Sequence, residues 1–115
     1  MHELSLAREV LDMVQAAARR DGFGRVAQLR LEVGALAGVE TQALRFALEA
    51  IVPGTCLAHA QIQIDTPPGT AWCVICTREV AITSYLDCCP ACAAPLTRQS
   101  GGDGLRVRDL LVHDD

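Results

Sequence analysis

The chain of 115 residues contains no lysine, and all ten of its basic residues are arginines scattered along the sequence. Only 3% of the residues are aromatic, and no basic stripe accompanies them, which counts against nucleic-acid binding. No apolar stretch approaches membrane-spanning length, and the first ten residues lack a basic start followed by an apolar run. These absences predict a soluble cytoplasmic protein with no nucleic-acid partner and no membrane partner.

Hydrophobic residues make up 50% of the chain, which is enough for a core. Because aromatics are scarce, that core must be aliphatic and small. The length suits one ordinary domain, or one small domain with a smaller satellite. The chain has a net charge of -4 and six cysteines. In a cytoplasmic protein, such cysteines indicate metal or redox chemistry rather than a disulfide framework.

Two segments have the periodicity of amphipathic helices. The first runs from Leu4 to about Arg20, and Asp21-Gly22 ends it. Its apolar residues recur every three or four positions: Leu4, Ala7, Leu11, Val14 and Ala18. The second begins with Thr41 as its expected N-cap and stops before Pro53-Gly54. Its apolar stripe is Leu44, Ala47, Leu48 and Ile51.

Three segments alternate between apolar and polar residues, as half-buried strands do. They are "VAQLRLEV" at 26–33, "AQIQID" at 60–65 and "LRVRDLLV" at 105–112. The alternation of the last slips near Asp109, which predicts a bulge or an early end there. The expected fold is therefore α+β: a small three-stranded sheet covered by two helices.

Pro67-Pro68-Gly69 and the glycine-rich stretch at 100–104 bracket a segment of different composition. We expect one domain to combine residues 1–66 with 104–115, and a second to occupy 67–103. This inserted module is too small for a hydrophobic core of its own and needs a further cross-link to stay folded. The joints around Pro67 and Gly101 permit a swapped dimer without requiring one, so monomer and homodimer both stay open.

The sequence offers such a cross-link in two Cys-x-x-Cys pairs, "CVIC" and "CPAC". Two such knuckles can surround one tetrahedral zinc ion, which predicts a zinc-ribbon-like module. The ligands are Cys73, Cys76, Cys89 and Cys92. Cys88 creates an ambiguity of register, and Cys89 is preferred because Pro90 follows it and its spacing to Cys92 matches the first pair. Cys56 and Cys88 are expected to be ordinary thiols.

Four cysteines in this pattern have uses other than structural zinc. A redox Cys-x-x-Cys needs a helix N-terminus beside the first thiol, and neither pair introduces a helical pattern. An iron–sulfur cluster also takes four cysteines, and the sequence does not exclude it. With all four ligands spent, a zinc site is closed and does no catalysis. The module alone is equally compatible with an adaptor that binds another protein.

The first three residues, Met1, His2 and Glu3, offer a second set of metal donors. An N-terminal histidine is most often solvated and idle. However, the terminal amine, the His2 amide nitrogen and an imidazole nitrogen can close adjoining chelate rings, with the Glu3 amide or a carboxylate as a fourth donor. Nitrogen-rich planar sets of this kind suit Ni(II) and Cu(II).

"MHELSLA", "RLEVGALAGVE" and the CxxC…CPxC pattern with its glycine-preceded final strand resemble the HypA/HybF nickel-incorporation proteins, from Met1 to Val112. The resemblance implies Ni(II) as transient cargo at the MHE start and a structural Zn(II) on the four cysteines. It implies a non-enzymatic metallochaperone that delivers nickel to the large subunit of maturing [NiFe]-hydrogenase. It also implies the GTPase HypB as a partner and, in some organisms, the urease maturation proteins.

Carried over by residue, the resemblance makes His2 the principal nickel ligand and gives the Met1 amine and nearby backbone nitrogens as co-donors. Glu3 is then a supporting ligand or lies just behind the ligands. Glu40 matches an acidic position near the nickel site, and an acidic residue stabilised by a helix N-terminus is an equally good interpretation. The extra cysteine, Cys88, departs from the family pattern but leaves the zinc assignment intact.

Overall fold

The computed structural model describes residues 2–113, which form two compact units. The first unit contains residues up to 31, then 39–64 and the chain from 107 onward. The second contains 32–38 and 65–106. Residues 32–38, which the sequence pattern groups with the first domain, therefore cluster with the cysteine-bearing unit.

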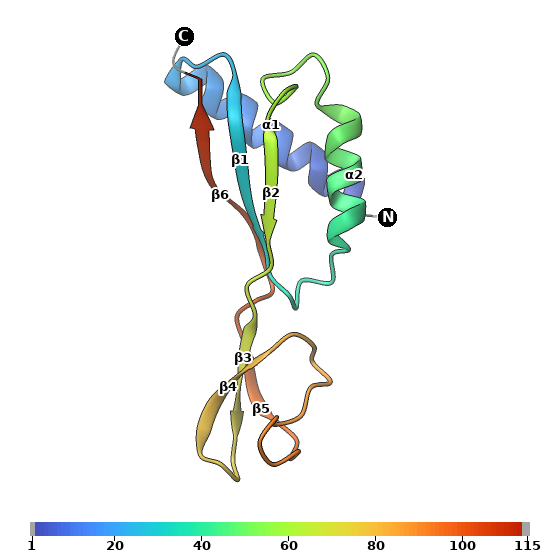
Figure 1. The fold of residues 1–115 in the computed structure, drawn as a ribbon, viewed down its shortest axis with the longest axis vertical. Helices are drawn as coiled ribbons and strands as arrows, with labels where there is room; N and C mark the ends of the chain where they lie inside the picture. Colours follow the sequence, from blue (N-terminus) through green and yellow to red (C-terminus); the bar gives the residue numbers. More distant parts are fainter. Residues whose placement is uncertain (1, 114–115) are drawn as a thin grey trace. The chain divides into compact units, whose positions relative to one another are not determined.

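The expected three-stranded sheet is present, in the order β2-β1-β6 (Figure 1). Its strands are β1 (Val26–Val33), β2 (Gln61–Asp65) and β6 (Leu105–Val112). Together with two helices and the cysteine module, it confirms the predicted α+β class. β6 continues through Asp109 to Val112, so the early end that the slipped alternation suggested is not found.

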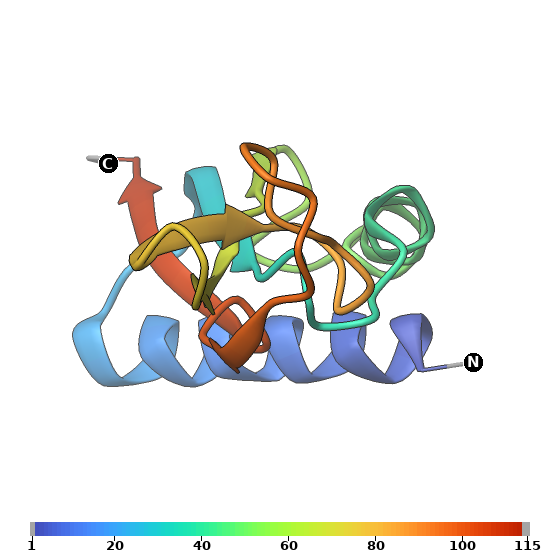
Figure 2. The same cartoon turned by 90° about the horizontal axis from the view of Figure 1, so that it is seen from below.

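Helix α1 (Glu3–Asp21) crosses one face of this sheet (Figures 1 and 2). Its buried side is Ala7, Val10, Leu11 and Val14. Leu4, which the periodicity placed in the apolar stripe, is instead 48% exposed because it lies in the first turn. The helix ends where Gly22 adopts a left-handed φ of 77° and donates its backbone N–H to Ala18.

Helix α2 (Thr41–Ile51) packs against α1 and lies beside β2 (Figure 1). Its N-cap is Glu40, not the predicted Thr41, because the Glu40 carboxylate accepts the backbone N–H of Ala43. Arg45 donates from Nη1 to the carbonyl of Ile62 at 2.6 Å. Since β2 is an edge strand, this bond satisfies a backbone acceptor that the sheet leaves unpaired.

The core of the first unit is aliphatic, as the composition predicted. Its fully buried large side chains come from both helices, the sheet and the loop before β2. They are Val10, Val14, Val26, Leu29, Leu31, Leu44, Leu48 and Leu57. None of the helices in the described part of the chain combines the length and the apolar character that a membrane span requires.

The second unit is built on another three-stranded sheet, β4-β3-β5. Its strands are β3 (Gly69–Cys73), β4 (Arg78–Ile82) and β5 (Thr97–Ser100). β3 pairs antiparallel with both neighbours. The core is small and contains two cysteines: Leu36, Ala71, Cys73, Val80, Ile82 and Cys89.

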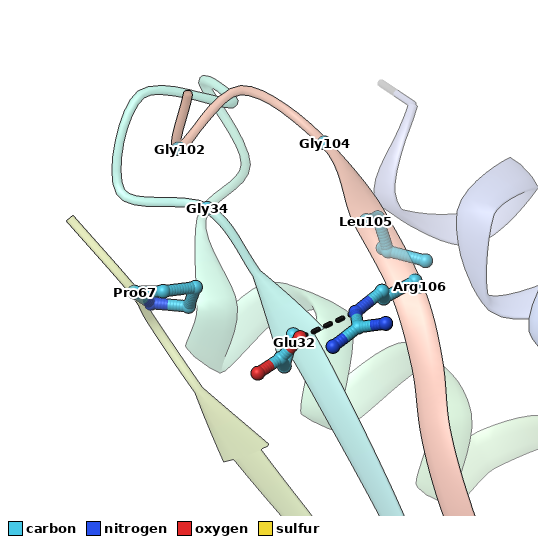
Figure 3. A pocket seen from close by; sticks show the side chains of 7 residues that line it. All are labelled: Glu32, Gly34, Pro67, Gly102, Gly104, Leu105 and Arg106. Atoms are coloured by element: carbon cyan, nitrogen blue, oxygen red, sulfur yellow. Dashed lines mark hydrogen bonds and ion pairs between the residues drawn. The ribbon is translucent and has the colours of Figure 1, made fainter. Parts of the chain in front are cut away.

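Loops of the second unit cross at close range at Gly34 and Gly102 (Figure 3). Leu36 donates its N–H to the Gly102 carbonyl at 2.6 Å, and Gly34 donates to the Gly104 carbonyl at 2.8 Å. A Cβ atom on Gly34 would overlap the Gly102 carbonyl, so only glycine fits there. A hollow of about 240 Å³ lies beside the crossing, where the Arg106 guanidinium donates to the Glu32 carboxylate.

Candidate metal centres

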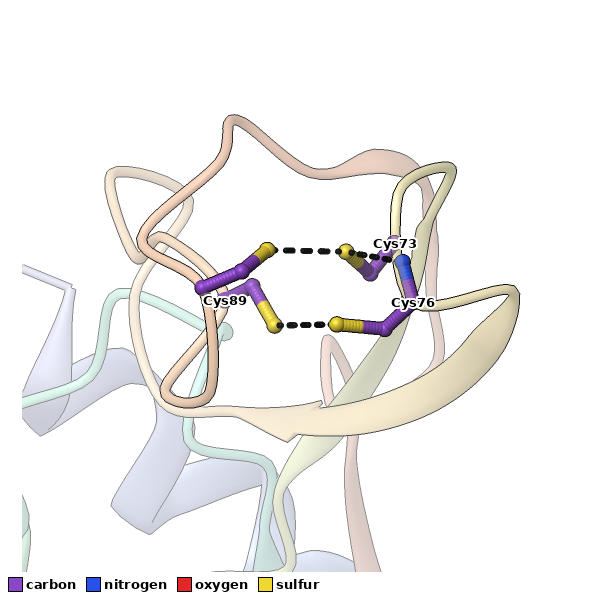
Figure 4. A group of neighbouring side chains, drawn as sticks. Cys73, Cys76 and Cys89 are labelled. Atoms are coloured by element: carbon purple, nitrogen blue, oxygen red, sulfur yellow. Dashed lines mark hydrogen bonds between the residues drawn. The ribbon is translucent and has the colours of Figure 1, made fainter.

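The four predicted ligand cysteines converge at one end of the second unit. Cys73 is the last residue of β3, and Cys76 lies in the turn that leads to β4. Cys89 and Cys92 come from the loop between β4 and β5. The Sγ atoms of Cys73 and Cys92 are 3.5 Å apart, and those of Cys76 and Cys89 are 3.9 Å apart. Figure 4 shows the sulfur atoms of the two knuckles facing one another.

The two Cys-x-x-Cys knuckles each contain a backbone turn of the same kind. In the first, the Cys76 N–H donates to the Cys73 sulfur at 3.3 Å. The residue after each second cysteine has a left-handed φ, 52° at Thr77 and 64° at Ala93. Residues other than glycine rarely adopt this backbone conformation, since it costs of order 1 kcal/mol or more. Both knuckles have this left-handed residue, and the two sulfurs of each knuckle point toward a common position.

The protein environment treats these thiols unequally. The backbone N–H groups of Cys92 and Ala91 lower the pKa of Cys89 to about 6. The neighbouring sulfurs of Cys92 and Cys73 raise the pKa of Cys76 to about 12. One thiolate therefore forms readily, and further negative charge at the same point is disfavoured. A divalent cation removes this conflict because it balances the charge of several thiolates together.

The four sulfur atoms all lie within 4.8 Å of one another. Sulfurs placed ~2.3 Å from a tetrahedral ion would be about 3.8 Å apart, which matches the observed pairs. Within residues 2–113, no other group of three or more Cys, His, Asp or Glu brings its ligand atoms together in this way. Cys56 and Cys88 lie outside the cluster. The donor set thus fits a closed tetrahedral metal site.

The N-terminal candidates lie at the start of α1 in the first unit. Met1 falls outside the described residues. The side chain of His2 is 57% exposed, and its Nε2 lies 3.6 Å from Oε2 of Glu3, whose side chain is only 13% exposed. His2 and Glu3 therefore present an imidazole and a carboxylate side by side at an open helix end.

Glu40 meets Glu3 through its backbone rather than through its carboxylate. The Glu40 N–H donates to Glu3 Oε2 at 3.3 Å, and this bond lowers the pKa of Glu3. The Glu40 carboxylate turns to its own helix and caps Ala43 at 2.5 Å. The structure thus brings the starts of α1 and α2 together. Periodicity and spacing do not predict this hydrogen bond, because no local pattern connects residues 37 positions apart; only the family resemblance had implied that Glu40 lies near the N-terminal site.

A helical α+β unit combined with a four-cysteine ribbon defines a small two-part metal-binding protein. The family model described as "Hydrogenase/urease nickel incorporation, metallochaperone, hypA" matches residues 1–112. The chain therefore belongs to the HypA family of nickel-incorporation metallochaperones, and the predicted resemblance is confirmed.

Curated relatives match along their full length. The chain is 50% identical to the hydrogenase maturation factor HypA of Polaromonas naphthalenivorans, with 100% of both chains covered. It is 51% identical to that of Cupriavidus necator, over 99% of this chain and 96% of the relative. The solution structure of the Ni metallochaperone HypA from Helicobacter pylori shares the fold, with a TM-score of 0.67 at 15% identity and 97% of each chain covered.

Proposed function

We propose that this protein binds Ni(II) at its N-terminus and delivers the ion for maturation of [NiFe]-hydrogenase. The observation that carries the proposal is the exposed His2 imidazole beside the anchored Glu3 carboxylate. Membership of a nickel-incorporation family supports nickel as the cargo. A transfer site benefits from few ligands at an exposed position, because a fully enclosed ion leaves slowly.

In this proposal the Ni(II) donors are the Met1 amine, the His2 amide and imidazole, and a donor from Glu3. Such a set favours Ni(II) and Cu(II), and Cu(II) binds at least as tightly by intrinsic preference. Selectivity must then come from metal supply and from the docking partner. The hydrogen bond from Glu40 fixes Glu3 Oε2 close to His2, so the α2 start serves to position the site.

Glu40 was predicted as either a nickel ligand or a residue stabilised by a helix N-terminus. Its cap on Ala43 supports the second interpretation. We therefore propose that Glu40 acts on the nickel site through its backbone N–H and not as a primary ligand. This assignment predicts that Glu40→Ala loosens the start of α2 more than it weakens Ni(II) binding.

We propose structural Zn(II) for the four-cysteine site. Four thiolates fill a tetrahedral shell and leave no open position, so this site supplies no catalysis and the protein is not an enzyme. The proposed partners are the GTPase HypB, the hydrogenase large subunit and, in organisms that make the enzyme, the urease maturation proteins. Their common place of action is the cytoplasm.

The test is a calorimetric Ni(II) titration of untagged wild-type protein, His2→Ala and a form extended ahead of Met1. We expect His2→Ala to lose stoichiometric binding while it keeps its zinc. The extended form should lose nearly as much, because the amine donor becomes an amide. Affinity should fall as the pH drops, because protons compete with the metal for its nitrogen donors.

Glu3→Gln is the graded variant in this series, since its backbone nitrogen remains available. It should weaken Ni(II) binding less than His2→Ala does. Tight, unchanged Ni(II) binding by His2→Ala would overturn the proposed nickel site. The fold of each variant is checked by circular dichroism, so that loss of binding is separated from loss of structure.

A further inference from the structure

The loop between α2 and β2 contains a Cys-x-x-His sequence, Cys56 to His59, that neither proposed metal site uses. Successive turns shape this loop: the Thr55 N–H donates to the Val52 carbonyl, the Ala58 N–H to Thr55, and the Ala60 N–H to Leu57. Leu57, the residue after the cysteine, is completely buried. The loop backbone is therefore anchored in the core of the first unit, which fixes the backbone positions of Cys56 and His59.

The start of β1 joins this loop to the end of the chain. The Val26 N–H donates to the Cys56 carbonyl at 2.9 Å, and the His113 N–H donates to the Arg25 carbonyl at 3.1 Å. Because β1 is the central strand, the loop before β2 and the end of β6 lie on its two sides. Two adjacent residues thus hold the backbones of Cys56 and His113 at one end of the sheet.

Cys56, His59 and His113 line one small pocket. Its volume is about 30 Å³, and its walls are Arg25, Val26, Thr55, Cys56, Ala58, His59 and His113. That space accepts an ion and not an organic ligand. Cys56 is half-buried, whereas His59 and His113 are exposed. Arg25 has an interaction of its own.

We propose that Cys56, His59 and His113 form a second metal site, for a borderline divalent cation of the zinc, cobalt and nickel class. One thiolate and two imidazoles are donors that such ions prefer over Mg(II) or Ca(II). The Cys-x-x-His spacing places two of them on one turn, as the Cys-x-x-Cys pairs do in the ribbon. With three protein ligands, the fourth position stays open and the ion can exchange.

The Cys56 sulfur and the two imidazoles do not converge in the structure as the four ribbon sulfurs do. Closing this site therefore requires rotation of the two exposed imidazoles toward the sulfur, while the backbone is already held. Burial raises the pKa of Cys56, so the thiol stays protonated until a metal displaces the proton. The donors are separate from His2 and from the four-cysteine cluster. The inference therefore does not rest on the proposed nickel function.

The experiment uses Co(II), which gives a thiolate-to-metal absorption band when it is bound through sulfur. One equivalent is added to full-length protein whose ribbon is loaded with zinc, and zinc retention is measured in parallel. Wild type should develop the band with a stoichiometry near one. Cys56→Ser should lose it, and His59→Ala and His113→Ala should each weaken Co(II) binding by about tenfold or more.

The matched control is Cys88→Ser, an exposed thiol outside the pocket, which should keep the full band. His2→Ala should also keep it, so failure of the proposed nickel site and failure of this site are distinguishable. Absence of the band in wild type, or its persistence in Cys56→Ser, would overturn the inference. If Cys56→Ser misfolds, the two histidine variants decide the question, because both side chains are exposed.

Discussion

The two units of this protein reach stability by different means. The first buries a set of aliphatic side chains from two helices, the central strand β1 and a loop. In the second, the buried core has only six members, and two of them are metal-ligating cysteines. Metal is therefore part of the core in one unit, whereas the proposed nickel site of the other lies at an exposed helix end. In the proposed function, the protein thus separates a metal that supports folding from one that is carried.

The expected energies differ accordingly. Each fully buried leucine or valine contributes about 1.5–3 kcal/mol, and the first unit has many of them. A structural zinc contributes about 10–16 kcal/mol in small zinc domains, more than the few apolar side chains of the second unit supply. The second unit should therefore be folded only with metal, while the first should fold without it.

The largest effect is expected from Cys73→Ala, which removes both a ligand and a buried core residue. We expect loss of bound zinc and unfolding of the second unit, while core amides of the first unit stay protected from hydrogen exchange. Cys88→Ala is the control and should keep both metal and fold. A Cys73→Ala protein with full zinc and native exchange in residues 65–106 would contradict the division drawn here.

Gly34→Ala tests the second unit without touching its metal. The added Cβ would overlap the Gly102 carbonyl, so backbone has to move, at a cost of about 2–3 kcal/mol. Gly24→Ala is the matched control, because nothing lies within 4 Å of its Cβ position and the change should stay within about 0.5 kcal/mol. Denaturant unfolding of the zinc-loaded proteins measures both. Equal stability of the two variants would refute the close crossing of these loops.

The smallest effect concerns the link between the helix starts in the first unit. The pKa of Glu3 is lowered from its usual 4.5 by the Glu40 N–H, so the bond stabilises the fold above that pH. It is lost as the pH falls through the lower, folded-state pKa. The Glu40 amide resonance should therefore titrate with a midpoint below 4.5. In Glu3→Gln the transition that belongs to Glu3 should be absent. A wild-type midpoint at or above the usual value would contradict the bond.

Sequence reasoning located most of the elements because their signals are local. Alternation over 26–33 matches β1, and the helical spacing before Gly22 matches α1. The two Cys-x-x-Cys pairs predicted a shared metal site, and their sulfurs do converge. These features depend on residues within one turn, one strand or one short motif, where periodicity and ligand chemistry are decisive.

The features that were missed depend on contacts between distant residues or on which group a single side chain hydrogen-bonds. β5 is four exposed residues without alternation, and it pairs with β3 some 30 positions away. Residues 32–38 belong to the second unit through long-range contacts, such as the hydrogen bond from Leu36 to Gly102 and the packing of Leu36 in that unit's core. Glu40 replaces Thr41 as the N-cap because its carboxylate happens to reach Ala43. No pattern in the sequence specifies such pairings.

The discontinuity of both units has a consequence for how the chain is made. The second unit contains residues 32–38 together with 65–106, and the first contains β6, which starts at Leu105 and follows every strand of the second unit along the chain. During translation, domains fold as their residues emerge. Here neither unit is complete until the residues up to β6 have left the ribosome. Synthesis of β6 thus completes both units together, and metal binding by the four cysteines is expected to follow it.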